Sequence, residues 1–101
     1  MNKYTELSDF DINKKVAENL KLKTIAYERT EIVLFDDMDA TPFEPCNNPS
    51  DAMPIIIENG ISMVRVNNTW SARQFNNHCI EINGDNYYRI AMEVYLLMNG
   101  K

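Results

Sequence analysis

The residue types best suited to chemistry gather at one loop-to-helix junction: Glu44, Cys46, Asn47, Asn48 and Asp51. Asn48 followed by Pro49 and an acid at Asp51 is typical of a helix start, where backbone N–H groups remain free. Such a start attracts anions and is a candidate binding site. Glu44 and Asp51 bring negative charge to it, however, and the segment has no glycine-rich phosphate loop. The favoured interpretation is a self-capped helix that locks the loop, and ligand binding is the alternative.

Two cysteines and one histidine are the candidates for a nucleophile or a metal site. Cys46 and His78 could pair as a thiol and its base, but nothing in the sequence orients the histidine or makes the surroundings of Cys46 electropositive. Cys46, His78 and Cys79 could supply three zinc ligands, whereas structural zinc sites use four ligands in closely spaced pairs. We therefore expect structural or incidental thiols, no metal and no cofactor.

Arg65, Trp70 and Arg89 are candidates for specific side-chain pairing. Arg65 and Trp70 fall opposite each other in a predicted hairpin, where the guanidinium could lie over the indole or cover the edge of a core aromatic. Arg89 falls in the first turn of the last predicted helix, which is unfavourable for a cation. It should therefore have a specific carboxylate partner, and the Glu44–Asp51 junction is the candidate.

Tyr88 belongs to a surplus of large side chains on the last predicted helix. Some of the tyrosines on this helix, Tyr87, Tyr88 and Tyr95, could form with Met92 an exposed patch for a partner or a second copy of the chain.

The size and charge of the chain limit the classes of function. Its 101 residues predict a single domain. The excess of 15 acidic over 10 basic residues, net charge −5, disfavours partners recognised through phosphates, nucleic acid included. No apolar stretch approaches the ~20 residues of a membrane span, and residues 1–6 do not resemble a signal peptide. We expect a soluble, cytoplasmic protein that does not bind a membrane.

The first half of the chain predicts a helix, then strands, then a long loop. Ser8 precedes an apolar helical period, which predicts a helix over residues 8–20. Residues 23–35 are rich in β-branched and aromatic side chains and indicate one or two strands with a break near 28–31. Residues 36–49 form a long polar connection.

Two further helices are predicted from their caps. Asn48 should begin a helix that bends at Pro54 and ends near Asn59, with a glycine in the next position. Asn86 should cap the last helix, whose apolar stripe continues to a glycine at position 100.

Between these helices, Asn67 and Asn68 predict the two-residue turn of a hairpin formed by residues 61–66 and 69–75. Its core face should carry Ile61, Met63, Trp70 and Ala72. Residues 79–82 should add an edge strand. The predicted fold is α+β, a mostly antiparallel sheet of three to five strands packed with three helices in an α-β-α sandwich-like arrangement.

Three segments resemble the lambdoid-phage NinX family: YTELSDFDINKKVA at residues 4–17, EPCNNPSDAMPIIIEN at 44–59 and RIAMEVYLLM at 89–98. The sequence departs from the family pattern at Met53, where we expect tryptophan, and at Tyr87, where we expect proline. The resemblance implies a phage or prophage accessory protein with a layout like the phage ABA-sandwich domain. It implies no known activity.

Two classes of function remain. The first is a non-enzymatic interaction protein that binds and modulates a host or phage macromolecule, for example in counter-defence; a homodimer is compatible with it. The second is a binder of a nucleotide-type metabolite at residues 47–51, with Arg65, Arg73 or Arg89 as counter-charge. An enzyme is disfavoured because no acid–base pair, metal set or activated nucleophile can be assembled.

Overall fold

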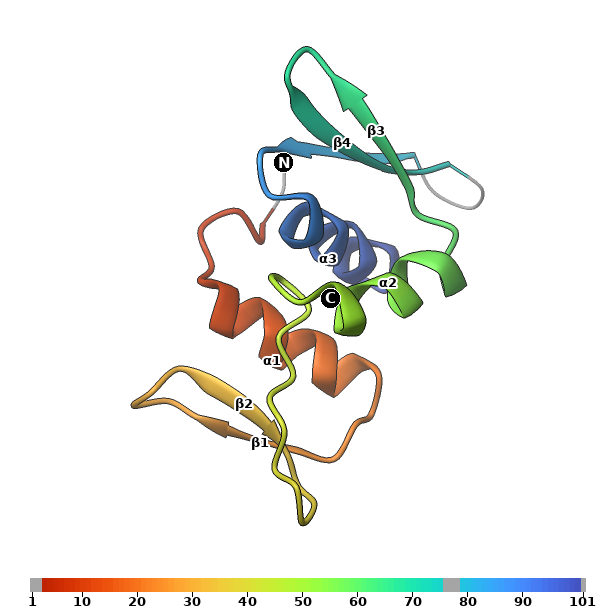
Figure 1. Cartoon of the computed structure of the whole chain (residues 1–101). Coiled ribbons are helices and arrows are strands. Elements are labelled where there is room, and N and C mark those ends of the chain that lie inside the picture. The colour runs from red at the N-terminus through yellow and green to blue at the C-terminus, as the bar shows by residue number, and fades with distance from the viewer. Residues whose placement is uncertain (1–2, 76–78, 101) are drawn as a thin grey trace.

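The computed structural model describes residues 3–75 and 79–100. In chain order the elements are α1 (Asp9–Asn19), β1 (Thr24–Tyr27), β2 (Ile32–Phe35), α2 (Pro49–Glu58), β3 (Ser62–Val66), β4 (Thr69–Gln74), β5 (Ile80–Gly84) and α3 (Tyr87–Met98). The predicted α+β class is confirmed. The strands divide into two antiparallel sheets, β1–β2 and β3–β4–β5, which lie at opposite ends of the molecule (Figure 1).

Each helix begins at a cap that the local sequence specifies. The cap side chains Ser8, Asn48 and Asn86 accept hydrogen bonds of 3.0–3.1 Å from backbone N–H groups of the first turn. α2 continues through Pro54 and ends at Glu58, with Asn59 as its C-cap. Gly60 follows with a φ of 63°, as the predicted glycine stop requires.

The three-stranded sheet has the register predicted from its turn. Asn67 and Asn68 both have positive φ, 49° and 67°, which suits a two-residue hairpin turn. Arg65 lies opposite Trp70, and β5 adds to the far side of β4 as the predicted edge strand. The predicted core face is confirmed: Ile61 and Ala72 are buried, and Met63 and Trp70 pack against the core.

Ser71 lies on the face of this sheet opposite the core face, yet its side chain is also buried. Its hydroxyl donates to Glu81 Oε2 (2.8 Å) and accepts from Arg73 Nε (3.0 Å). Arg73 and Glu81 form an ion pair above it (3.3 Å). Two long charged side chains therefore cover the small serine at the centre of the sheet.

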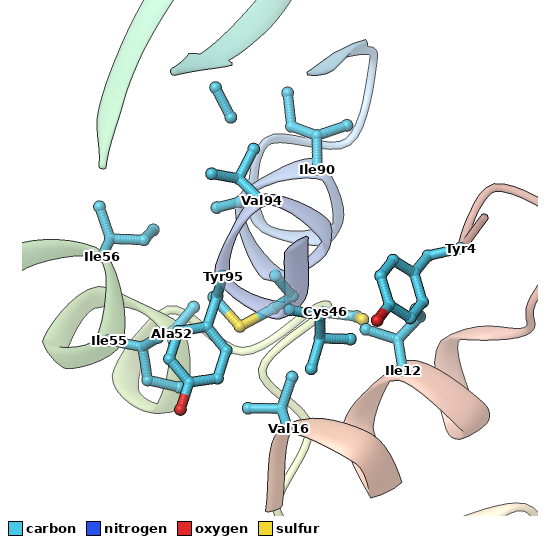
Figure 2. Packing of buried hydrophobic residues seen from close by; sticks show 14 of the residues in the cluster. Tyr4, Ile12, Val16, Cys46, Ala52, Ile55, Ile56, Ile90, Val94 and Tyr95 are labelled. Atoms are coloured by element: carbon cyan, nitrogen blue, oxygen red, sulfur yellow. The ribbon is translucent and has the colours of Figure 1, made fainter. Parts of the chain in front are cut away.

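α3 is the centre of the fold. It contacts α1 and α2 on one side and strands β4 and β5 on the other (Figure 1). Figure 2 shows Ile90 and Val94 of α3 among the apolar side chains of the core. Met92 is buried there, so its predicted place in an exposed patch is wrong, and Tyr95 is buried as well, because other elements cover α3 on both sides.

The β1–β2 hairpin lies against α1 at the other end of the molecule. The chain after β2 returns along it: Phe35 N–H donates to Thr41 O (2.9 Å) and Phe43 N–H donates to Val33 O (2.8 Å). Phe43 also packs edge-on against Phe35, with ring centroids 5.6 Å apart. Part of the predicted long loop is thus ordered along the sheet. Within the described ranges, no helix is long and apolar enough to cross a membrane.

Candidate functional site

Arg89 joins segments that are far apart in the sequence. From the first turn of α3 its guanidinium donates to Asp9 Oδ1 (2.7 Å) and to Glu93 Oε2 (2.6 Å). It also donates to the backbone oxygens of Tyr4 (2.9 Å) and Leu7 (2.8 Å). The expected carboxylate partner exists, but its predicted location is wrong, because Asp9 and Glu93 fill the role and the Glu44–Asp51 junction does not.

The surroundings of Arg89 keep it charged and occupied. Burial by itself lowers its pKa, yet the hydrogen bonds to Asp9 and Glu93 outweigh burial and raise the pKa above its ordinary value. The side chain is only 14% exposed. Since its N–H groups already bond within the chain, Arg89 has little capacity left to provide counter-charge for a ligand.

The junction residues bond mainly to one another and to α1. Asp51 Oδ2 accepts from Glu44 N–H (2.9 Å), which links the two acids predicted to repel an anion. Cys46 N–H donates to the buried Asn13 side chain (3.0 Å), and the Asn47 amide donates to Asp9 Oδ2 (3.1 Å). Together with the Asn48 cap, these bonds make the segment a structural clasp around the start of α2.

The clasp extends to α3 through Asn86, the N-cap residue of α3. Asn86 Nδ2 lies 3.4 Å from Asn47 Oδ1. Asp9 accepts from Arg89 with one carboxylate oxygen and from Asn47 with the other. The junction and α3 therefore meet at the first turn of α1. Asp9 could not be identified from local sequence, because its partners lie 38 and 80 positions away.

Cys46 lies inside the core beside α1 and α3 (Figure 2) and is fully buried. Burial, with the Asp9 carboxylate nearby, raises the pKa of the Cys46 thiol far above its ordinary value, which opposes formation of a thiolate nucleophile. His78, the proposed base and zinc ligand, lies outside the described residues, while Cys79 is an exposed free thiol. The described residues contain no group of three metal-ligating side chains.

Arg65, Trp70 and Tyr88 belong to a second group, at the meeting of the β3–β4–β5 sheet with the start of α3. The Arg65 guanidinium lies over the Trp70 ring, 5.1 Å from its centre, which is the first of the two predicted arrangements. Trp70 meets Tyr87 edge-on at 4.9 Å, and Tyr87 meets Tyr88 in the same way at 4.9 Å. These rings are half-buried, and they pack against the core as well as against one another.

A third region was missed by sequence analysis. Cross-strand pairing places Ile25 opposite Leu34 and Tyr27 opposite Ile32, so all four share the side of the hairpin away from buried Val33. We call these four residues the hairpin face. Ile25 is 43%, Tyr27 46% and Ile32 37% exposed. The sequence signal was present, since a continuous apolar run such as Ile32–Phe35 makes both faces of a strand apolar.

The loop after β2 holds one more apolar side chain in solvent. Asp37 Oδ1 accepts from the backbone N–H groups of Asp39 (3.0 Å) and Ala40 (2.8 Å). Ala40 adopts a φ of 47°, which completes the tight turn. Met38 lies within this turn and is fully exposed. The turn therefore has its own internal bonds and presents Met38 between three aspartates.

Comparison with known proteins identifies the family. The family model for NinX of bacteriophage P22 matches residues 3–99, which includes the clasp, the hairpin and all three helices. No curated protein and no solved structure shows significant similarity to the chain. On the extent of this match, the chain belongs to the NinX family of phage proteins.

Proposed function

We propose that this phage accessory protein acts in the host cytoplasm by binding another protein, without catalysis, and that the hairpin face is its contact surface. The observation that carries the proposal is the exposure of Ile25, Tyr27 and Ile32 on one side of a two-stranded sheet. An exposed group of large apolar side chains rimmed by charge is typical of a protein-binding site.

The size and type of these side chains support the proposal. Burying one large apolar side chain contributes about 1.5–3 kcal/mol, so the three exposed residues would be strong anchors. Tyrosine is enriched among residues that dominate binding energy. Met38 adds a flexible thioether that adapts to a partner's shape.

The alternatives receive less support from the geometry. A metabolite site at residues 47–51 needs free amides and a free cation, yet Asn48, Asp51 and Arg89 are engaged inside the clasp. A thiol nucleophile at Cys46 would have to ionise within the core. These contacts favour a structural role for the Glu44–Asp51 junction, which is the interpretation that its sequence already favoured.

The test is a comparison of matched surface variants. Ile25→Ser/Tyr27→Ser removes two anchors of the hairpin face, while Ile57→Ser removes an exposed isoleucine (70%) from α2. Each protein would be tagged and captured from phage-infected cells, and the recovered proteins identified by mass spectrometry. We expect one protein to be retained by wild type and by Ile57→Ser and lost from the hairpin variant.

Thermal unfolding of all three proteins provides the folding control. If the hairpin variant keeps the same captured proteins as wild type while remaining folded, the hairpin face is not the contact surface.

A further inference from the structure

The hydrogen bonds of β2 determine which backbone groups of β1 face outward. Val33 accepts from Phe43 and Phe35 donates to Thr41, so both residues direct their polar groups away from β1. In an antiparallel pair, opposite residues either bond to each other or both point away. The residues opposite Val33 and Phe35 are Ala26 and Thr24. Their N–H and C=O groups therefore point to the free side of β1.

This edge of β1 is open within the described part of the chain. The sheet contains β1 and β2 alone, and the returning segment 41–43 occupies the other side of β2. Native edge strands are protected by short length, proline, a bulge or an inward-pointing charge, and β1, with four residues, has only the first of these. Thr24–Tyr27 contains no proline or charge, and its pairing with β2 is continuous without a bulge.

We propose that the partner of the hairpin face docks by strand addition: an extended, basic and apolar segment of another protein pairs with the free edge of β1. This inference rests on the proposed function and specifies its mode. Hydrogen bonds to Thr24 and Ala26 align the incoming strand. Alternate side chains of that strand then lie beside Ile25 and Tyr27 and enlarge the apolar face.

Charge selects the chemistry of the partner. Residues 21–39 carry five acids, Glu28, Glu31, Asp36, Asp37 and Asp39, against three bases, Lys21, Lys23 and Arg29, and Glu28 is paired with Lys14 of α1 (3.0 Å). The whole chain has a net charge of −5. A second copy would bring the same negative charge to the edge, whereas a basic segment is attracted to it.

The probe is a synthetic eight-residue peptide that alternates lysine and valine, with both ends blocked. Two matched peptides accompany it: one alternates glutamate and valine, and one carries the lysine–valine sequence with alternate backbone nitrogens methylated. Binding is followed by fluorescence anisotropy at low ionic strength, and amide exchange is followed by NMR. We expect the lysine–valine peptide to bind and to slow exchange at Thr24 and Ala26. The other two should bind at least tenfold more weakly.

Proline variants of the protein test whether the free edge of β1 is the binding site. Thr24→Pro and Ala26→Pro each remove an N–H group that faces away from β2, so the β1–β2 ladder is kept and the edge is blocked. Each should weaken peptide binding at least tenfold, while Ile57→Ser should leave it unchanged. The methylated peptide gives the same information without altering the protein, should either variant fail to fold.

The outcomes separate the two proposals. If Ile25→Ser/Tyr27→Ser weakens peptide binding but neither the proline variants nor backbone methylation does, strand addition is overturned and the contact surface stands. If no change to the hairpin affects binding, both are overturned. If the glutamate–valine peptide binds as tightly as the lysine–valine peptide, the proposal that the partner segment is basic is overturned. A dimer in sedimentation that Ala26→Pro dissociates would instead make the occupant of the edge a second copy, against this proposal.

Discussion

At the scale of single residues, Arg89 connects the most distant parts of the chain. Arg89→Met would remove the cation that compensates Glu93, whose side chain is only 7% exposed, and would leave two backbone oxygens without this donor. Removing one member of a buried ion pair costs about 3–5 kcal/mol. We therefore expect urea denaturation to show a loss of that order.

A double variant serves as the control for this prediction. Arg89→Met/Glu93→Met removes the buried carboxylate together with its cation, and it should recover part of the loss because the carboxylate that remains without its cation, Asp9, is 41% exposed to water. A loss below about 1 kcal/mol in the single variant would show that the pair is no more than a surface contact.

Cys46 gives a prediction about pH. Its pKa in the fold is raised from the ordinary value of 9.0, so above that pH the unfolded chain releases a proton that the folded chain retains. Stability due to the thiol is therefore complete below pH 9 and is lost as pH rises towards the folded pKa. The loss should approach about 1.4 kcal/mol per pH unit.

Urea unfolding of wild type and Cys46→Ala at pH 8, 9 and 10, under reducing conditions, isolates this effect. Buried Tyr4 and Tyr95 also have raised pKa values, but their ordinary value is 10.0, so their contribution begins at higher pH. The wild type should lose more stability than the variant between pH 9 and 10. Parallel pH profiles would contradict the assignment.

The hydrogen-bond partners of a residue could be predicted from the sequence when they lie nearby in the chain, but not when they lie far away. The caps Ser8, Asn48 and Asn86 bond to groups two or three positions away, and local pattern was sufficient to predict them. Arg89 and Asp9 are separated by 80 positions. The need of Arg89 for a carboxylate could be argued from the helix dipole, but the identity of that carboxylate depends on how the helices pack.

At the scale of elements, the approach of α3 to its sheet depends on a glycine. A Cβ at Gly84 would lie 2.7 Å from Cγ2 of the buried Ile90. Gly84→Ala should therefore destabilise the protein by about 1–3 kcal/mol through overpacking. Ile90→Leu moves the branch away from Cβ, so the pair Gly84→Ala/Ile90→Leu should be more stable than the sum of the two single changes predicts.

A thermodynamic cycle from denaturation of the four proteins measures this coupling. Additive effects would mean that another contact, and not the Ile90 methyl group, limits the space at Gly84.

Pairing of neighbouring strands was predictable, whereas their assignment to sheets was not. The turn at Asn67 and Asn68 determines the β3–β4 register locally. Whether β1–β2 joins that sheet depends on which side of α1 it contacts, and the apolar pattern of Ile32–Phe35 is compatible with either place. The hairpin face was missed for the same reason, because a strand that is apolar on both sides is expected to be buried on both sides.

At the scale of the whole molecule, the chain is elongated, with principal extents of 41 × 24 × 23 Å. α3 is enclosed by other elements, whereas the β1–β2 hairpin rests on α1 and exposes its other side (Figure 1). Segments with few buried apolar contacts open at lower free energy than the core. The hairpin should therefore open locally while the three helices remain folded.

Native-state amide exchange would measure this difference directly. The ladder amides of Ile25 and Tyr27 should exchange with an opening free energy below about half of the global value, while those of Val94 and Leu96 in α3 should exchange only through global unfolding. Thr24 and Ala26 should exchange faster still, because their N–H groups face the open edge. Equal protection of hairpin and α3 would mean that the molecule unfolds as one unit. An independent opening of the hairpin would instead show that the three helices and the clasp stay folded without it.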